Sequence, residues 1–173
     1  MKTRGIWFFA LVLACCTTQA AEDASVKQVV KGKVEEINNA LIKGDFAKVA
    51  DLTHPNVVKL MGGRDKMISV MESGIKDMKS KSYAFRSVKV DASSDLVAAG
   101  PDVFVVVPFL LEMKAPGGKI RQKSFVIGVS SDKGKSWTFV NGDLDIKKVK
   151  QVLPNLPEQL KLPKRQTPVF EKD

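Results

Sequence analysis

His54 is the residue in this chain that is best suited to moving a proton, and it is the only histidine. An imidazole titrates near neutral pH and can act as a general base. Asp51 stands three residues earlier and could orient the ring if a helix continues to that point, and Tyr83 or Glu112 could donate a hydrogen bond. A lone histidine before Pro55 can equally cap a helix or lie on the surface, so the catalytic role of His54 is an alternative hypothesis.

Residues 128–132 place a serine near glycine, but they do not form the turn of a serine hydrolase. Asp132 stands where that turn needs its second glycine. The spacing of Ser130, Asp132, Gly134 and Trp137 instead resembles an Asp-box hairpin. In such a hairpin the aspartate accepts hydrogen bonds from turn amides and glycine takes positive φ. We therefore predict a structural role for this segment.

Metal-binding patterns are weak, and we expect neither a metal site nor a cofactor. A single histidine cannot build the usual zinc shell. Residues 91–95 alternate oxygen-bearing side chains like the start of a calcium loop, but Leu96 occupies the position that needs glycine. Asp143 and Asp145 are more simply explained as capping residues for a following helix.

The charge of the chain is +9, and lysine supplies most of the positive side chains. Recognition of phosphate prefers arginine, and only one tyrosine is present to stack on bases, so we expect no nucleic-acid partner. Residues 119–123 and 147–150 are rich in lysine and could attract an anionic polymer of a cell envelope. A basic adaptor for such a partner is a further alternative function.

Residues 1–20 have the pattern of an export signal. Lys2 and Arg4 precede an apolar run over residues 6–14, and small residues flank Gln19. Cleavage after Ala20 would remove both cysteines and lower the formal charge to +7. We therefore expect a periplasmic or secreted protein, with attachment to a membrane only if a lipoprotein signal leads to lipid modification of Cys15.

The mature chain is predicted to begin with three helices. The first covers residues 25–43 and ends at Gly44, and Asp45 caps a short second helix that Pro55 stops. Residues 57–61 read as an extended segment. A third helix starts near Arg64 with an apolar stripe of methionines and Ile75, which predicts core packing or, alternatively, an adaptable pocket wall.

From residue 83 onward the pattern changes to strands. We expect strands at residues 83–90, 95–99, 103–113, 120–129 and 136–140, with a type II turn at residues 115–118. Helices followed by an antiparallel meander make an α+β domain over residues 21–142. Residues 143–173 are predicted to form a C-terminal extension, with a helix over residues 145–152 and then a proline-rich segment that lies against the domain.

The strand over residues 103–113 is apolar on both faces, whereas a sheet with one wet face should alternate apolar and polar residues. One face must therefore pack on the helices. The other needs cover from the C-terminal segment or from a second subunit, and we predict a homodimer through this outer face.

Three segments resemble the nuclear transport factor 2-like (SnoaL-like) superfamily. Residues 40–46, with Val49 and Leu52, resemble its second-helix region, and residues 63–67 look like the opening of its third helix. Residues 136–140 are similar to its closing strand. The resemblance extends over residues 26–141, and it implies a cone-shaped curved sheet packed on three N-terminal helices, with an internal pocket.

Enzymes of this superfamily often place several acidic, histidine or tyrosine side chains in that pocket. This chain has one histidine and one tyrosine, and residues 53–56 lack the acid that is common after the second helix. We therefore expect an exported, non-catalytic domain that binds a small apolar or amphipathic ligand or serves as an interaction domain. The expected ligand-binding residues are His54, Met67, Met71 and Tyr83. The alternative is an isomerase or dehydratase that uses His54 as its general base.

Overall fold

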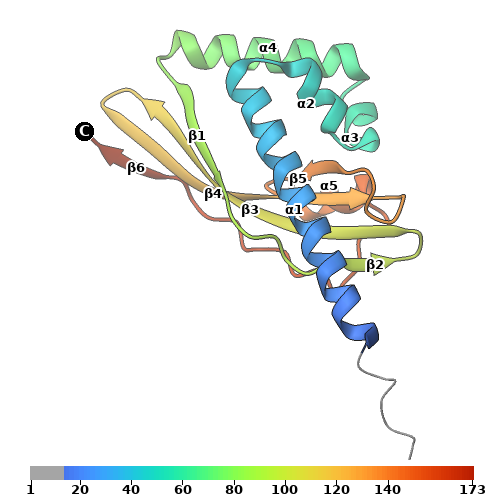
Figure 1. The fold of residues 1–173 in the computed structure, drawn as a ribbon. Helices are drawn as coiled ribbons and strands as arrows, with labels where there is room; N and C mark the ends of the chain where they lie inside the picture. The colour runs from blue at the N-terminus through green and yellow to red at the C-terminus, as the bar shows by residue number, and fades with distance from the viewer. Residues whose placement is uncertain (1–13) are drawn as a thin grey trace, which may run out of the picture.

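The computed structural model describes residues 14–173, in which a helical part precedes an antiparallel sheet (Figure 1). The helices before the sheet are α1 (Ala14–Lys43), α2 (Phe46–Leu52), α3 (Pro55–Leu60) and α4 (Arg64–Ser80). The strands are β1 (Ala84–Val90), β2 (Val97–Ala99), β3 (Asp102–Ala115), β4 (Gly118–Ser130), β5 (Thr138–Asn141) and β6 (Val169–Lys172), and α5 (Ile146–Val152) lies between the last two. This arrangement confirms the α+β class.

The long hairpin of β3 and β4 forms the centre of the sheet. Its register runs from Val103 opposite Ser130 to Ala115 opposite Gly118. β1 and β2 pair with the free edge of β3, while β5 and β6 pair with the free edge of β4, all antiparallel. The hairpin turn places Gly117 at φ +73°, as a type II turn requires, and so agrees with the sequence prediction.

One face of the sheet packs against α1. Val30 and Val34 of α1 are fully buried against Val105 and Val107 of β3 and against Trp137. The helical spacing of the valines brings them to one side of α1, and the period of two in β3 brings its odd-numbered residues to the same face. This confirms that one apolar face of β3 packs on the helical part.

The opposite face of the sheet is covered by the C-terminal segment. Phe104 and Val106 of β3 and Ile127 of β4 pack with Val149 and Leu160, and all five are buried. The chain itself therefore provides the cover that this face of β3 needs. The homodimer expected through this face stays a prediction, but burial of these residues no longer requires it.

The prediction of an extended segment at residues 57–61 is wrong, because these residues belong to α3 or follow it directly. Pro55 begins this helix rather than only ending α2, since proline has no amide hydrogen to satisfy and its fixed φ suits the first helical position. In residues 14–173, four helices rather than the predicted three precede the sheet. β6 was also not predicted, since the proline-rich pattern before it indicated only an extended chain.

The predicted capping roles of Gly44, Asp45 and Asp145 are confirmed, whereas the predicted start of the first helix at residue 25 is wrong, because α1 begins at Ala14. Asp143 does not cap α5, since its carboxylate accepts hydrogen bonds from Ser124 and Gln122. Gly44 adopts φ +79° after α1, and the Asp45 carboxylate accepts a hydrogen bond from the Lys48 amide at 3.1 Å. At α5 the Asp145 carboxylate accepts one from the Lys147 amide at 2.8 Å. Part of the expected signal segment, residues 1–13, lies outside the described residues. Within residues 14–173, no helix has the length and apolar content of a membrane span.

Candidate functional site

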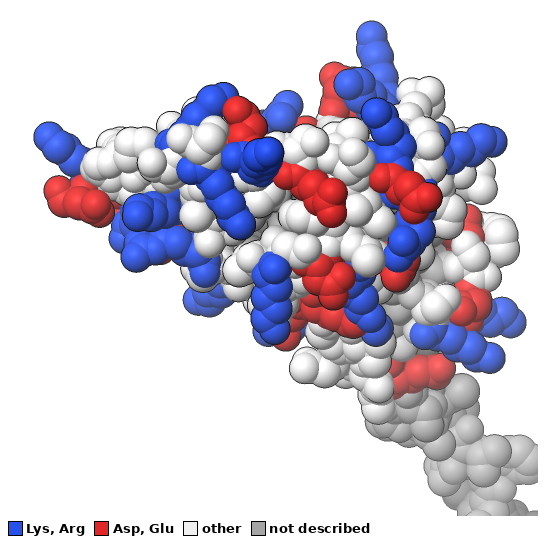
Figure 2. Space-filling model, turned by 90° about the horizontal axis from the view of Figure 1, so that it is seen from above, with Lys and Arg blue, Asp and Glu red and all other residues white. Residues whose placement is uncertain are grey.

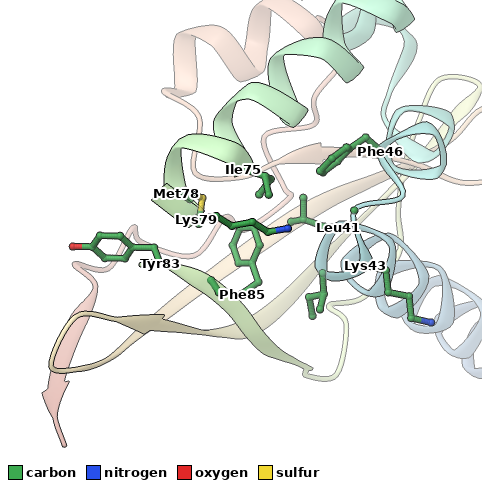
Figure 3. A pocket seen from close by; sticks show the side chains of 11 residues that line it. Leu41, Lys43, Phe46, Ile75, Met78, Lys79, Tyr83 and Phe85 are labelled. Carbon is green, nitrogen blue, oxygen red and sulfur yellow. The ribbon is translucent and has the colours of Figure 1, made fainter. Parts of the chain in front are cut away.

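A pocket of about 290 Å³ lies between the end of α1, the start of α2, the last turns of α4 and the start of β1. Figure 3 shows Leu41, Phe46, Ile75, Met78 and Phe85 turned toward one another around it. Phe46 is buried, and the other four side chains are partly buried. The volume is near the lower end of the range for small-molecule sites, and the lining has their usual apolar character.

Two sharp changes of chain direction form this pocket. Gly44 turns the chain at the end of α1, so that Phe46 folds back against Leu41. At the end of α4, Ser82 adopts φ +64° and the Tyr83 amide donates a hydrogen bond to the Met78 carbonyl at 2.9 Å. The chain then enters β1 directly, so the start of β1 forms the side of the pocket opposite the last turns of α4.

The polar side chains of the pocket lining are those of Lys43, Lys79 and Tyr83. In Figure 3 the Lys79 side chain lies across the pocket toward Leu41, whereas Lys43 and the Tyr83 ring point away from it. Lys79 lies in the last turn of α4, where a positive charge also complements the negative end of the helix dipole. Neither imidazole nor carboxylate is present in the lining, so the pocket offers apolar contact and one positive charge.

His54 lies elsewhere, at the start of α3. Its Nδ1 atom accepts a hydrogen bond from the Asn56 amide at 3.2 Å, which makes it the N-cap of that helix. Its own amide donates to the Phe139 carbonyl of β5 at 2.9 Å. Burial lowers the pKa of the imidazole, with Asp102 opposing the shift, so the ring is neutral at pH 7 and suited to accept the capping bond.

The side chains expected to assist His54 have other partners. Asp51 accepts a hydrogen bond from Arg64 Nε at 2.9 Å, and this contact lowers the pKa of the carboxyl group. Glu112 accepts one from Arg121 Nε at 3.2 Å. Arg121 also donates to Glu171 of β6 at 3.1 Å, and Glu112 forms an ion pair with Arg86 of β1. Glu112 therefore belongs to an ion-pair network that links β1, β3, β4 and β6.

The ligand-binding residues expected from the sequence are spread over the helical part. Met67 is buried near the start of α4, Met71 is partly buried one turn later, and Tyr83 stands at the edge of the pocket. His54 lies apart from this pocket. The structure thus joins Tyr83 with Ile75 and Met78, the later members of the predicted methionine stripe.

Sequence reasoning missed Leu41, Phe46, Phe85 and Lys79. Leu41 and Phe46 fall within the first and second predicted helices. Periodicity shows which side of a helix is apolar and not whether its partners fill the space. Phe85 was part of a predicted strand. Lys79 directly follows Met78, and that position at the end of an apolar stripe was the one available sequence signal.

The predicted Asp-box turn is confirmed in its hydrogen bonds. The Asp132 carboxylate accepts from the Ser136 amide at 2.8 Å and from the Ser130 hydroxyl at 2.8 Å, and Gly134 adopts φ +89°. Trp137 is buried and its Nε1 donates to the Gly134 carbonyl at 3.0 Å. These bonds use the polar groups of the segment for structure.

Two further hollows are smaller or more open. One of about 190 Å³ lies between the outer face of the sheet and residues 163–166, and a shallow one of about 540 Å³ lies beside α3. In the part of the chain that the structure describes, no group of three or more histidine, cysteine or acidic side chains could hold a metal ion. Figure 2 shows lysine and arginine interspersed with acidic side chains on the face seen from above.

Comparison with known proteins adds no relative, since no family model, no curated protein and no solved structure matches this chain.

Proposed function

We propose that this protein is an exported, non-catalytic domain that binds a small apolar ligand in the pocket between α1, α4 and β1. The observation that carries the proposal is the lining itself, in which five apolar side chains converge on about 290 Å³ of space (Figure 3). Burying apolar ligand surface there would contribute roughly 25 cal/mol for each Å² removed from water. The half-buried state of Leu41, Ile75, Met78 and Phe85 leaves surface for a ligand to cover.

The chemistry of the pocket favours binding over catalysis. Proton transfer needs a group that can take or give a proton near neutral pH within reach of the reacting atom. The pocket lining offers no carboxylate or imidazole, and the nitrogen of His54 that lacks a proton already accepts the bond that caps α3. We therefore favour the binding domain over the isomerase or dehydratase.

The nuclear transport factor 2-like resemblance belongs to the same proposal. Helices that precede a meander of antiparallel strands, with a pocket between the two parts, agree with the expected architecture. The cone shape and the membership of that superfamily are proposed on the motifs of residues 40–46, 63–67 and 136–140. Export rests on the pattern of residues 1–20.

The test is a binding measurement with the fluorescent anionic probe 1-anilinonaphthalene-8-sulfonate, whose aromatic rings bind apolar surface. We expect saturable binding with one site, and Ile75→Ser should weaken it about fivefold because it removes half-buried apolar surface from the lining. Val70→Ser on the same helix is the matched control, since Val70 is 46% exposed and does not line the pocket. Equal effects of the two variants would contradict the proposal. Turnover of a substrate that is lost in His54→Ala would establish the enzyme instead.

A further inference from the structure

Four apolar side chains form a row across one end of the sheet. Phe85 of β1 is the register partner of Met113 of β3, Met113 is that of Ile120 of β4, and Ile120 is that of Phe170 of β6. Cross-strand partners lie on the same face of a sheet with their side chains in contact distance. With strands about 4.8 Å apart, the row spans about 14 Å.

This row is the continuation of the pocket. Phe85 lines the pocket and is the first member of the row, so both lie on the face that carries α1. β6 and the β3–β4 turn extend beyond the helices in Figure 1. Met113 and Ile120 are only partly buried, and Phe170 is 53% exposed. An apolar strip therefore leads from the pocket to the edge of the sheet.

The close approach of β6 to β4 fixes the position of Phe170 at the end of this strip. Gly118 faces Phe170 and Glu171, and a Cβ atom there would overlap the Glu171 carbonyl oxygen and press on the Phe170 ring. Only glycine lets β6 approach β4 so closely. The outer side of β6 is anchored by the ion pairs of Glu171 with Arg121 and Lys119. Phe170 is thus held in place although its ring is half exposed.

Lys79 supplies a charge at the other end of the strip. Its side chain lies across the pocket (Figure 3), and among the described residues it has no carboxylate within ion-pair distance. An anionic group placed there would gain a partner without breaking an existing ion pair. The positive charge is complementary to an anionic head group, and the long apolar strip is complementary to a hydrocarbon chain.

We infer that the ligand is a single-chain amphipathic anion, such as a fatty acid, with its carboxylate at Lys79 and its hydrocarbon chain running through the pocket and along Phe85, Met113, Ile120 and Phe170. This inference rests on the proposed function and specifies its ligand class. The pocket alone holds only a short chain, and the row accounts for a longer one. A longer ligand buries more apolar surface and therefore binds more tightly.

The experiment compares hexadecanoate, octanoate and hexadecanol by displacement of the fluorescent probe from the purified protein. Hexadecanoate should bind at least tenfold more tightly than octanoate. Phe170→Ser should weaken hexadecanoate about tenfold and leave octanoate unchanged, because only the longer chain reaches this ring. Val169→Ser is the matched control, since Val169 is the neighbouring residue, is 58% exposed and lies on the opposite face.

The position of the carboxylate has its own pair of variants. Lys79→Gln should weaken hexadecanoate about threefold, the size expected for an exposed ion pair, and leave hexadecanol unchanged. Lys76→Gln, on the exposed side of the same helix, should affect neither ligand.

The results separate the strip from the pocket. If octanoate binds and Ile75→Ser weakens it, but Phe170→Ser has no effect on hexadecanoate, the pocket stands and the strip is refuted. If no ligand displaces the probe, the ligand class is refuted. If the protein sediments as a dimer that Phe170→Ser converts to a monomer, the strip is covered by a second copy and the inference is overturned.

Discussion

At the scale of single residues, the tightest steric constraints lie at glycines of the sheet and its flanking turns. A Cβ atom at Gly142 would overlap the ring of Phe125, which is buried in the outer core cluster. The Gly142 amide also donates to the Phe125 carbonyl at 2.9 Å, so the backbone cannot move away freely. These contacts explain why the turn after β5 begins with glycine.

We therefore predict that Gly142→Ala lowers the free energy of unfolding by about 1–3 kcal/mol, because it overpacks a filled site. Gly74→Ala is the control, since the space around Gly74 is open and alanine favours its helical position by about 1 kcal/mol. Urea unfolding of both variants checks this. A Gly142→Ala variant as stable as the original protein would contradict the packing argument.

Asp132 makes the stability of the Asp-box turn depend on pH. Hydrogen bonds from Ser136 and Ser130 lower the pKa of its carboxyl group to about 2 from an ordinary value of 3.8. The folded state therefore favours the charged form, and this stabilisation is complete above pH 4 and is lost as the pH falls from about 4 to 2.

The matched variant is Asp132→Asn, which keeps the size of the side chain and removes its charge. We expect the original protein to be the more stable of the two at pH 6, with the difference narrowing between pH 4 and pH 2. Thermal unfolding across this range measures it. A difference that does not change with pH would contradict the assignment of these hydrogen bonds to an ionised Asp132.

At the scale of elements, the C-terminal extension is part of the core and not an appendage. α5 and residues 153–162 pack on the outer face of the central hairpin around Phe104, Val106 and Ile127. Asn56 Nδ2 of α3 donates to the Val152 carbonyl at 2.8 Å. The extension therefore connects the outer face of the sheet to the helical part.

Leu160→Ala tests this connection. Leu160 is 5% exposed within the outer cluster, so we expect a loss of about 2–4 kcal/mol from the free energy of unfolding. Leu60→Ala is the control, because Leu60 is 52% exposed and its truncation should change stability by less than about 0.5 kcal/mol. Similar small losses in both variants would show that the extension does not belong to the cooperative unit.

At the scale of the whole molecule, export and assembly are the open proposals. α1 begins at Ala14 and passes through the expected cleavage position after Ala20. Among the side chains of α1 that the structure describes, Val26, Val30 and Val34 pack in the cluster that contains Trp137. All three lie after Ala20, so removal of residues 1–20 leaves them in the chain.

We predict that the exported protein begins at Ala21 and folds with the stability of the full chain. Mass spectrometry of the protein from the envelope or the medium gives its first residue, and thermal unfolding compares the two forms. A first residue at Cys15 carrying lipid would support the lipoprotein alternative, and an unprocessed chain retained in the cytoplasm would contradict export. Sedimentation of the same sample tests the predicted homodimer.

The sequence by itself determined the local structure of this protein. Capping, turn formation and strand alternation each depend on a few consecutive residues. The caps and turns therefore form from near neighbours in the chain, as they do at Gly44, Asp45, Asp132 and Asp145. The alternation of residues in β3 is local in the same way. The α+β class followed from these patterns, and so did the order of the elements apart from α3 and β6. The one element of the helical part that was predicted wrongly, α3, begins at a proline that can either end a helix or start one.

Only the tertiary structure decided what the apolar residues face. In α1, Leu41 lines a pocket, whereas Val30 and Val34 at the same helical spacing fill a core. The difference arises because packing depends on partners that are distant in sequence. His54 is a helix cap because α3 follows it and the Asn56 amide of that helix donates to its Nδ1 atom. The row from Phe85 to Phe170 likewise exists only through strand pairing, which joins residues 85 positions apart.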